Sequence, residues 1–408
     1  MGSAQSVTIN SFLQKAKNTI CHTKQICNFV LGTQNKEPFD KILHSHQRAR
    51  ARSVCNGRLR AMPSYLYMKT IFTAIVLVAG CILTTQAQTV YEVDSHPGYN
   101  CWPMIQHVGK RLVCIYTIGK HHDPWEKGRA AYARHSDDGA KTWSEKVLID
   151  HNASYGTSSI GKGTDKDGNA LFWIRRLDTD RRMALYRTSD GIRFELLSAP
   201  LLHPKPMQVT DIFHTPDAIA CLWFSDDYSP EKANKSWGIL ISTDNGVTWE
   251  QRTIEDHLKI NEWPTEPSVA VLGDGRLLAV ARSEGNTGYQ FQLTSSDWGK
   301  TWEKHRTNIT DIKESTPSLI FDKASGRIYN YYYQRGAGLL KVRVAKANKV
   351  FTSPLSWPKP RIIAHGGTKR PWDSGNANAV ASGKKHFITY YSGDSINCKV
   401  VVATNGIR

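Results

Sequence analysis

Short apolar runs alternate with polar positions through the C-terminal three quarters of the chain. Residues 269–272, 277–282 and 289–293 are three such runs in one stretch, and a fourth run follows Trp302. Alternation with a period of two residues is typical of β-strands that bury one face. No stretch of ten residues in this region shows the 3.6-residue period of an amphipathic helix. The pattern therefore predicts an all-β protein.

A turn sequence recurs between these runs. It reads Ser-x-Asp-x-Gly-x-Thr-Trp at 242–249 and 295–302, with a variant at 136–143 and an eroded copy from Thr188 to Phe194. The copies begin at residues 136, 188, 242 and 295, so the steps are 52, 54 and 53 residues. The Asp accepts hydrogen bonds from the backbone ahead of it, and the Gly permits a positive φ. The turn is therefore structural, and its fixed step indicates repeated units around a common core.

The repeat predicts the fold class. Residues 88–408 number 321 (408 minus 87), and the mean step of 53 residues, (295 minus 136)/3, divides them into six units. Each unit holds about four short strands, so we predict a six-bladed β-propeller of four-stranded antiparallel blades. The last unit lacks the Trp, and we expect it to close on the beginning of the propeller.

Two segments precede the predicted propeller. Residues 1–67 carry ten Lys or Arg and two acidic residues, with no copy of the repeat, and we interpret them as a basic, disordered leader or an upstream extension. Five of their arginines cluster, but no aromatic platform or binding motif accompanies them, so no nucleic-acid partner is predicted. The rest of the chain has only a mild basic excess.

Residues 68–87 have the form of a secretory signal. Lys69 is followed by an apolar run over 71–83 and by small residues that end at Ala87. The run is shorter than the ~20 residues that span a bilayer. We therefore expect cleavage after Ala87 and a secreted, periplasmic or cell-surface protein. Two alternatives place the protein at a membrane: lipidation at Cys81, in a lipobox-like sequence, or an uncleaved signal anchor.

Polar residues on the strands that begin each unit need a reason, because these strands face the axis of a propeller. The predicted inner strands bring five of them toward one axis: Asp211, Glu266, Glu314, Asp373 and Asn376. A ring of carboxylates is electrostatically unfavourable unless cations or a ligand face it. Arg282 and Arg335 are the candidate cations.

The recurring turn is the Asp-box, and residues 88–408 resemble the sialidase (neuraminidase) superfamily of six-bladed propellers. The resemblance implies an Asp general acid, matched by Asp123, and a Glu that pairs with the nucleophile, matched by Glu266. It also implies three arginines for a substrate carboxylate, of which Arg282 and Arg335 match the second and third. The implied substrate is a glycan with a terminal acidic sugar, and no cofactor is implied.

Two residues of the family pattern are not matched. Cys101-Trp102-Pro103 stands where the family has Arg-Ile-Pro, so the first arginine is missing, and Trp102 either stacks on a sugar ring or packs between blades. The nucleophilic Tyr is expected near Asn376, and Tyr390 and Tyr391, one strand later, are the alternative nucleophiles.

Each candidate also has a structural explanation. Asp123 is suited to cap the turn before Pro124, and Glu266 to form a buried pair with Arg282. Asp211 and Asp373 are suited to bond neighbouring turns or strand ends. The histidines 121, 122 and 214 lack the spacing of a metal site, so we predict no metal.

Three hypotheses for function follow. The first is a secreted glycoside hydrolase resembling exo-α-sialidases, with Asp123 as acid/base and Glu266 in support of the nucleophile. The second is a non-catalytic glycan-binding propeller, favoured by the two unmatched residues. The third is a glycosidase of altered specificity that uses other carboxylates of the funnel, Asp211, Glu314 or Asp373.

Overall fold

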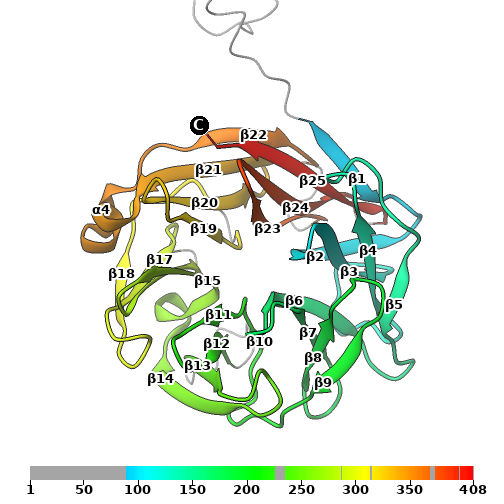
Figure 1. Cartoon of the computed structure of the whole chain (residues 1–408), viewed down its shortest axis with the longest axis horizontal. Coiled ribbons are helices and arrows are strands. Elements are labelled where there is room, and N and C mark those ends of the chain that lie inside the picture. The colour runs from blue at the N-terminus through cyan, green and yellow to red at the C-terminus, as the bar shows by residue number, and fades with distance from the viewer. Residues whose placement is uncertain are drawn as a thin grey trace, which may run out of the picture. The chain divides into compact units, whose positions relative to one another are not determined.

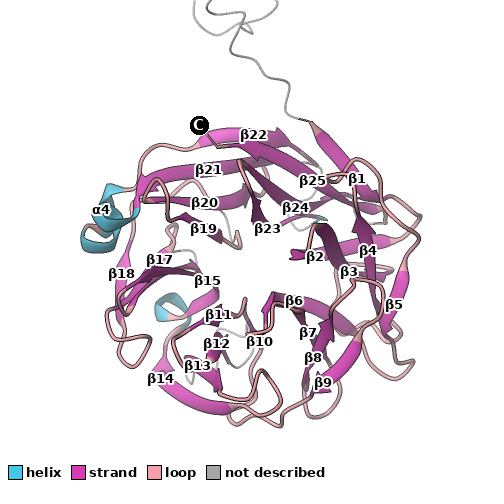
Figure 2. Cartoon of the chain, viewed as in Figure 1, coloured by secondary structure: helices cyan, strands magenta, loops and turns pink. Residues whose placement is uncertain are grey.

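The computed structural model describes residues 89–225, 235–285, 287–312, 315–367, 373–394 and 396–407. The predicted leader and signal, residues 1–87, therefore lie outside the described residues. Strands make up most of the described part, as Figure 2 shows. Its only helical elements are η1 (Ile260–Glu262), α4 (Ala347–Thr352) and η2 (Pro354–Ser356). No helix in the described ranges has the length and apolar character needed to cross a membrane.

The described strands follow one another in chain order. They are β1 (Val90–Asp94), β2 (Tyr99–Val108), β3 (Arg111–Gly119), β4 (Ala130–Ser136), β5 (Val147–Asp150), β6 (Thr157–Thr164), β7 (Ala170–Arg176), β8 (Met183–Thr188), β9 (Glu195–Ser198), β10 (Gln208–Val209), β11 (Phe213–His214), β12 (Ile219–Phe224), β13 (Lys235–Ser242), β14 (Glu250–Leu258), β15 (Pro264–Gly273), β16 (Arg276–Ser283), β17 (Phe291–Ser295), β18 (Glu303–Arg306), β19 (Ser318–Asp322), β20 (Arg327–Gln334), β21 (Leu339–Lys346), β22 (Arg361–His365), β23 (Ser374–Ser382), β24 (Lys385–Gly393) and β25 (Cys398–Gly406).

These strands form sheets arranged radially around an axis (Figure 1). Three sheets have four strands each, β6 to β9, β15 to β18 and β19 to β22. The sheet from β10 to β14 has five, because its inner strand is interrupted at residues 210–212 and both pieces pair with β12. The remaining sheet has eight strands, in the order β23-β24-β25-β2-β3-β4-β5, with β1 also paired to β25.

The all-β propeller class is confirmed, and the six blades that the sequence predicts are not six separate sheets. The described strands form five separate sheets. The physical reason is a parallel bridge between Tyr99 and Cys398, which joins β2 to β25 and merges two groups of four strands into one sheet. The repeat spacing cannot reveal a contact of this kind, because the bridging residues lie 299 positions apart (398 minus 99).

The propeller closes by pairing its first strand with its last, as predicted. β1 runs antiparallel to β25, with Val90 opposite Ala403 and Glu92 opposite Val401. Figure 1 shows β1 beside β25 at the edge of the ring. The two ends of the described chain are thus held in one sheet.

The Asp-box turns have the structural role that their residues predict. In the turn between β17 and β18, the Asp297 carboxylate accepts bonds from the Thr301 backbone N–H at 2.9 Å and the Ser295 hydroxyl at 2.8 Å. Gly299 has a φ of 84°, and its N–H donates to Ser295 Oγ. The Trp302 ring packs edge to face against Trp237 of the preceding sheet. The turn therefore joins neighbouring sheets through its Trp.

Asp94, at the end of β1, is the polar anchor of the closure. Its side chain is fully buried, lies 3.4 Å from the Arg134 guanidinium, and accepts bonds from the Tyr116 hydroxyl and the His96 N–H. Burial by itself raises the pKa of Asp94, but these hydrogen bonds and Arg134 outweigh it and hold the pKa below its usual value. The carboxylate is therefore ionised in the folded protein at neutral pH.

We expect Asp94→Ala to lower the free energy of unfolding by about 3–5 kcal/mol, because it leaves Arg134 buried without its carboxylate. The matched control is Glu92→Ala on the same strand, whose ion pair with Lys399 is about half exposed. That change is expected to alter stability by less than about 1 kcal/mol. Urea unfolding of both variants tests the closure, and equal effects would contradict it.

Candidate functional site

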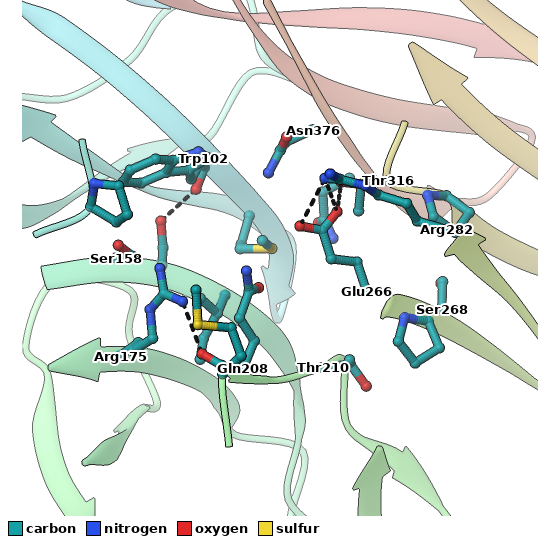
Figure 3. A pocket seen from close by; sticks show the side chains of 18 of the residues that line it. Trp102, Ser158, Arg175, Gln208, Thr210, Glu266, Ser268, Arg282, Thr316 and Asn376 are labelled. Carbon is teal, nitrogen blue, oxygen red and sulfur yellow. Dashed lines mark hydrogen bonds and ion pairs between the residues drawn. The ribbon is translucent and has the colours of Figure 1, made fainter. Parts of the chain in front are cut away.

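The inner ends of the sheets surround a cavity of about 760 Å³ (Figure 3). Residues from every group of strands line it. They include Trp102 on β2, Ser158 on β6, Arg175 on β7, Asp211 between β10 and β11, Glu266 on β15, Arg282 on β16, Glu284 just after β16, Thr316 before β19, Arg335 after β20 and Asn376 on β23. Of the sequence-predicted residues, the structure brings Trp102, Asp211, Glu266, Arg282, Arg335 and Asn376 together here.

Three of the lining residues have an unusual backbone conformation. Trp102, Glu266 and Asn376 have φ values of 51°, 48° and 49°, a region that side chains other than Gly seldom enter. Each lies where the register of an inner strand shifts by a bulge. A bulge turns a side chain away from the regular alternation, and such strained positions cluster at functional sites. The same device thus directs all three side chains into one cavity.

Glu266 and Glu284 share a single arginine. Arg282 Nη1 lies 3.4 Å from the Glu266 carboxylate, and Arg282 Nε lies 2.8 Å from Glu284 Oε1. Thr316 donates to Glu266, and Thr265 donates to Glu284 at 2.8 Å. The strand pairing sets this arrangement, because Arg282 on β16 stands opposite Thr265 on β15, next to Glu266.

The two carboxyl groups differ in their acidity. Burial alone raises the pKa of Glu266, but Arg282, the Thr316 hydroxyl and Arg335 outweigh it, so the pKa is lowered. Burial also raises the pKa of Glu284, and there Arg282 and Thr265 do not outweigh it, so the pKa stays above its usual value. The negative charge of Glu266 raises it further. Glu266 therefore holds a proton more weakly than Glu284 does.

Arg335 reaches the cavity from the end of β20. Its Nε donates to the Ser374 carbonyl at 3.1 Å, and Nη2 donates to Asn376 Oδ1 at 2.8 Å and to the Tyr391 hydroxyl at 3.3 Å. It lies close enough to Glu266 to lower the pKa of that carboxyl. Arg282 and Arg335 thus place two cations on one side of the cavity, as the sequence predicts.

Trp102 on β2 packs against two other polar side chains. The Arg129 guanidinium lies 4.8 Å from the centre of its ring, and the His122 ring meets it edge to face at 5.4 Å. Arg129 is fully buried and is not part of the cavity wall, whereas His122 is. Burial, together with Arg335 and Arg129, lowers the pKa of His122 to about 3, so its imidazole is neutral at physiological pH.

Asp211 lies at the floor of the cavity. It accepts bonds from the Lys162 backbone N–H at 3.1 Å and from Asn378 Nδ2 at 3.3 Å. Lys162 in turn donates to the Ala379 carbonyl on β23. Burial raises the pKa of Asp211, against the opposing effect of Lys162, and lowers the pKa of Lys162. These contacts tie the second and third sheets to β23. Asp211 therefore makes the kind of contact that the structural explanation predicts, a bond to neighbouring strands.

Asp123 does not line the cavity, so it is not brought together with Glu266. Its carboxylate is exposed and accepts the Trp125 backbone N–H at 2.9 Å. The contact that Asp123 makes is therefore a turn cap, as in the structural explanation. Its neighbours Pro124 and Trp125 do reach the rim of the cavity.

Three further predicted residues lie outside the cavity wall. Asp373 is buried and accepts the Tyr99 hydroxyl at 2.7 Å. Tyr390 donates to the His365 carbonyl, and the fully buried Tyr391 packs against His122. Burial raises the pKa of both Tyr390 and Tyr391. Neither tyrosine offers its oxygen to the cavity, and Glu314 lies outside the described residues.

Sequence reasoning missed Glu284, Arg175 and Ser158, and it did not choose between exposed and substrate-contacting roles for His122. A signal for Glu284 is present, because it follows Arg282 by two residues and so shares its face of the strand. No comparable signal marks Arg175, which follows five buried apolar residues on β7 and precedes the partly buried Arg176. Within the described ranges, no group of three or more His, Cys, Asp or Glu is arranged to hold a metal ion.

Comparisons with known proteins agree with this architecture. Residues 228–356 match the BNR repeat-like domain. A Dyadobacter fermentans protein of unknown function superposes with a TM-score of 0.65 and 18% identity over 79% of this chain and 98% of that one. The NanB sialidase of Streptococcus pneumoniae gives 0.57 and 13%, over 78% and 70%. The α-L-arabinofuranosidase Arb93A of Fusarium graminearum gives 0.54 and 13%, over 76% and 97%. No curated protein sequence matches this chain.

The fold is that of the sialidase-like propellers. The matched BNR segment contains the turns at 242–249 and 295–302, so it supports the repeat that the sequence shows. At identities of 13–18%, the structural likeness establishes the fold alone. What this chain does has to be argued from its own cavity.

We expect Arg282→Met to raise the pKa of Glu266, because the main cation that lowers it is removed. The measurement is a carboxyl titration by NMR with ¹³C-labelled glutamate. The control is Arg276→Met on the same strand, because the Arg276 guanidinium bonds Asn348 at the surface. This change should leave the pKa of Glu266 as it is. A Glu266 pKa that does not rise in Arg282→Met would contradict the shared-arginine arrangement.

Proposed function

We propose that this protein is a glycoside hydrolase that removes a terminal sugar from glycans, with Glu266 and Glu284 as its acid/base pair. One observation carries the proposal: two buried carboxyl groups share Arg282 in the cavity, and their pKa values move in opposite directions. Neighbouring titratable groups with separated pKa values are the mark of acid/base assignments in enzymes. The similar folds of a sialidase and an arabinofuranosidase support a glycosidase-like or glycan-binding propeller.

The roles follow from the protonation states. Glu284, held protonated, donates its proton to the glycosidic oxygen as the bond to the leaving sugar breaks. Glu266, held ionised, either takes a proton from an attacking water or attacks the anomeric carbon itself. Arg282 contacts both groups and stabilises negative charge on whichever carboxyl is ionised. Arg335 supplies a second cation, which suits a substrate with an acidic terminal sugar.

The sialidase-type nucleophile is not part of this proposal. Asn376 occupies the bulge on β23, and its amide oxygen already accepts a bond from Arg335. Tyr391 is fully buried and Tyr390 nearly so, and neither lines the cavity. The proposal is therefore a glycosidase of altered specificity whose acid is Glu284, a residue that none of the three sequence hypotheses named.

A glycan-binding propeller without turnover is the second candidate. The observation that favours it is Arg282 itself, since a carboxyl group engaged by a guanidinium is a weaker proton acceptor and nucleophile than a free one. Trp102, His122 and Trp125 on the facing wall would suit the apolar face of a sugar ring in either case.

We expect Glu266→Gln and Glu284→Gln each to lower kcat/KM by at least about 100-fold on an alkyl glycoside, whose leaving oxygen must be protonated, because each removes one partner of the acid/base pair. The substrate is found by screening a panel of aryl glycosides that includes acidic sugars. Glu303→Gln, an exposed glutamate on β18, is the control and should retain full activity. Binding of glycans with no turnover of any glycoside would favour the second candidate.

The pH profile of kcat/KM is expected to be bell-shaped. Activity falls as the pH drops through the lowered pKa of Glu266, because that group must be ionised, and falls as the pH rises through the raised pKa of Glu284, because that group must be protonated. On a substrate with an activated leaving group, which needs no proton, Glu284→Gln should lack the alkaline limb. An alkaline limb that persists in this variant would assign the acid role to another residue.

We also propose that the mature protein is secreted after cleavage behind Ala87. The support is the signal-like sequence of residues 68–87. In a secreting host, N-terminal sequencing of the exported protein is expected to begin at Gln88. A membrane-bound product that loses its lipid label in Cys81→Ser would instead establish the lipoprotein alternative.

A further inference from the structure

One polar side chain of the cavity wall is held by hydrogen bonds that the acid/base chemistry above does not use. His122 lines the cavity, and its Nδ1 lies 3.1 Å from the Tyr99 hydroxyl. That hydroxyl in turn donates to Asp373 Oδ1 at 2.7 Å. Tyr99 is fully buried and Asp373 nearly so, and neither lines the cavity. The bonds therefore run from the buried Asp373, just before β23, out to one imidazole on the cavity wall.

The direction of these bonds determines where the imidazole carries its hydrogen. A carboxylate only accepts hydrogen bonds, so the hydrogen of the Tyr99 hydroxyl is engaged by Asp373. Burial raises the pKa of Tyr99, so the hydroxyl keeps that hydrogen. In the bond between Tyr99 and His122, the hydrogen must then come from the imidazole. His122 is therefore the tautomer with its hydrogen on Nδ1 and a lone pair on Nε2.

Three aromatic rings hold the imidazole in its orientation. Trp102 and Tyr99 meet the His122 ring edge to face, with ring centres 5.4 Å and 5.8 Å away. Tyr391 stacks on it at 6.2 Å. A group that recognises a ligand needs packing of this kind, because a ring that turns loses its hydrogen-bond direction.

The charges around His122 keep the imidazole neutral. Burial lowers its pKa to about 3, and three arginines act in the same direction: Arg335, Arg129 and Arg282. Glu266 acts in the opposite direction and does not outweigh them. A neutral imidazole with its hydrogen on Nδ1 has no hydrogen to donate from Nε2. At its Nε2 atom, His122 is therefore a hydrogen-bond acceptor.

The Nε2 atom is the polar part of His122 that a ligand can reach. Nδ1 is turned to the buried Tyr99, and Nε2 lies on the other side of the ring carbon between them. Nε2 makes no hydrogen bond to any residue within the ranges that the structure describes. A few placed polar groups in a cavity set the orientation and the specificity of a ligand. The ligand group that suits this atom is a hydroxyl, which donates one hydrogen.

We propose that His122 determines which sugar binds, by accepting at Nε2 a hydrogen bond from a hydroxyl of the terminal sugar, with Tyr99 and Asp373 as the residues that position its hydrogen on Nδ1. This inference rests on the proposed glycosidase function for naming that sugar as the terminal one, since Glu266 lies close enough to act on the pKa of His122. The substrate class is then a glycan whose terminal sugar has a free hydroxyl close to the bond that is cleaved. A site built to bond a hydroxyl rejects an analogue that lacks it.

The tautomer is measured on the full chain without any ligand. A long-range ¹H–¹⁵N spectrum of ¹⁵N-histidine-labelled protein distinguishes a protonated from an unprotonated ring nitrogen, and the signals missing in His122→Gln identify His122. We expect the hydrogen on Nδ1 at neutral pH. Tyr99→Phe removes the acceptor of that hydrogen and should move it to Nε2. The matched control is Tyr390→Phe, which should leave it on Nδ1, because the Tyr390 hydroxyl donates to the His365 carbonyl.

A second variant reaches the same bonds without removing a buried hydroxyl. In Asp373→Asn the amide can donate to the Tyr99 oxygen, so the Tyr99 hydrogen becomes available to His122. We expect the imidazole hydrogen to move to Nε2 in this variant as well. Circular dichroism of each variant confirms that it is folded.

The substrate contact is measured by calorimetric titration of the full chain carrying Glu284→Gln, so that turnover does not consume the ligand. The probes are the methyl glycosides of N-acetylneuraminic acid, L-arabinofuranose, galactose and glucuronic acid, each with its monodeoxy analogues. We expect one deoxy analogue to bind about fivefold to tenfold more weakly than its parent. Adding His122→Phe should abolish that difference, because the ring remains and the acceptor is lost. His122→Gln, whose amide oxygen can replace Nε2, should restore part of it.

A hydrogen on Nε2 in the wild-type protein, or a deoxy penalty that His122→Phe leaves unchanged, would overturn the inference. Binding of none of the four glycosides would overturn the substrate contact. The result is separable from that of the proposed function. A hydrogen on Nδ1 with a penalty that depends on His122, in a protein whose wild type cleaves nothing, supports the acceptor and contradicts the glycosidase. Cleavage that depends on Glu284, with the hydrogen on Nε2, has the reverse meaning.

Discussion

The pairing of β1 with β25 is the constraint on which the rest of the structure depends. A radial arrangement of sheets leaves an open edge on its first and last members unless the two ends of the chain meet. Here Val90 to Asp94 complete the last group of strands, and the buried Asp94 carboxylate ties that strand to Arg134 in the first group. Closure fixes the circumference, and the circumference fixes how far apart the inner strands stand around the cavity.

Within that fixed ring, Arg282 sets the acidity of the two carboxyl groups that it contacts in the cavity. Its two carboxyl partners lie on β15 and just after β16, where like charges would otherwise repel. One cation cannot offset burial equally for both carboxyl groups, so their pKa values divide: that of Glu266 is lowered and that of Glu284 is raised. The separation of the two pKa values thus follows from sharing one guanidinium.

The sequence predicted the all-β propeller, the turn role of the Asp-boxes and the closure on the chain's beginning, because each leaves a periodic or local signature. It also predicted that Glu266, Arg282 and Arg335 meet. It did not predict Glu284 or Arg175. A charged residue near the end of an apolar strand gives the same sequence pattern whether its side chain faces solvent or the axis of the propeller. The resemblance placed Asp123 in the site, but its carboxylate accepts the Trp125 backbone N–H, and only its neighbours Pro124 and Trp125 line the cavity.

The strained backbone at the bulges persists because contacts between neighbouring sheets support it. A left-handed backbone at Glu266 or Asn376 is unfavourable, and it persists only where the surroundings determine the chain on both sides. Two residues further on, Ser268 accepts the Leu319 N–H of the next sheet, and Asn378 accepts the Ile105 N–H. Each bulge is thus followed at once by a bond to the neighbouring inner strand. The contacts that hold the sheets together are therefore the ones that keep the strained residues aimed at the cavity.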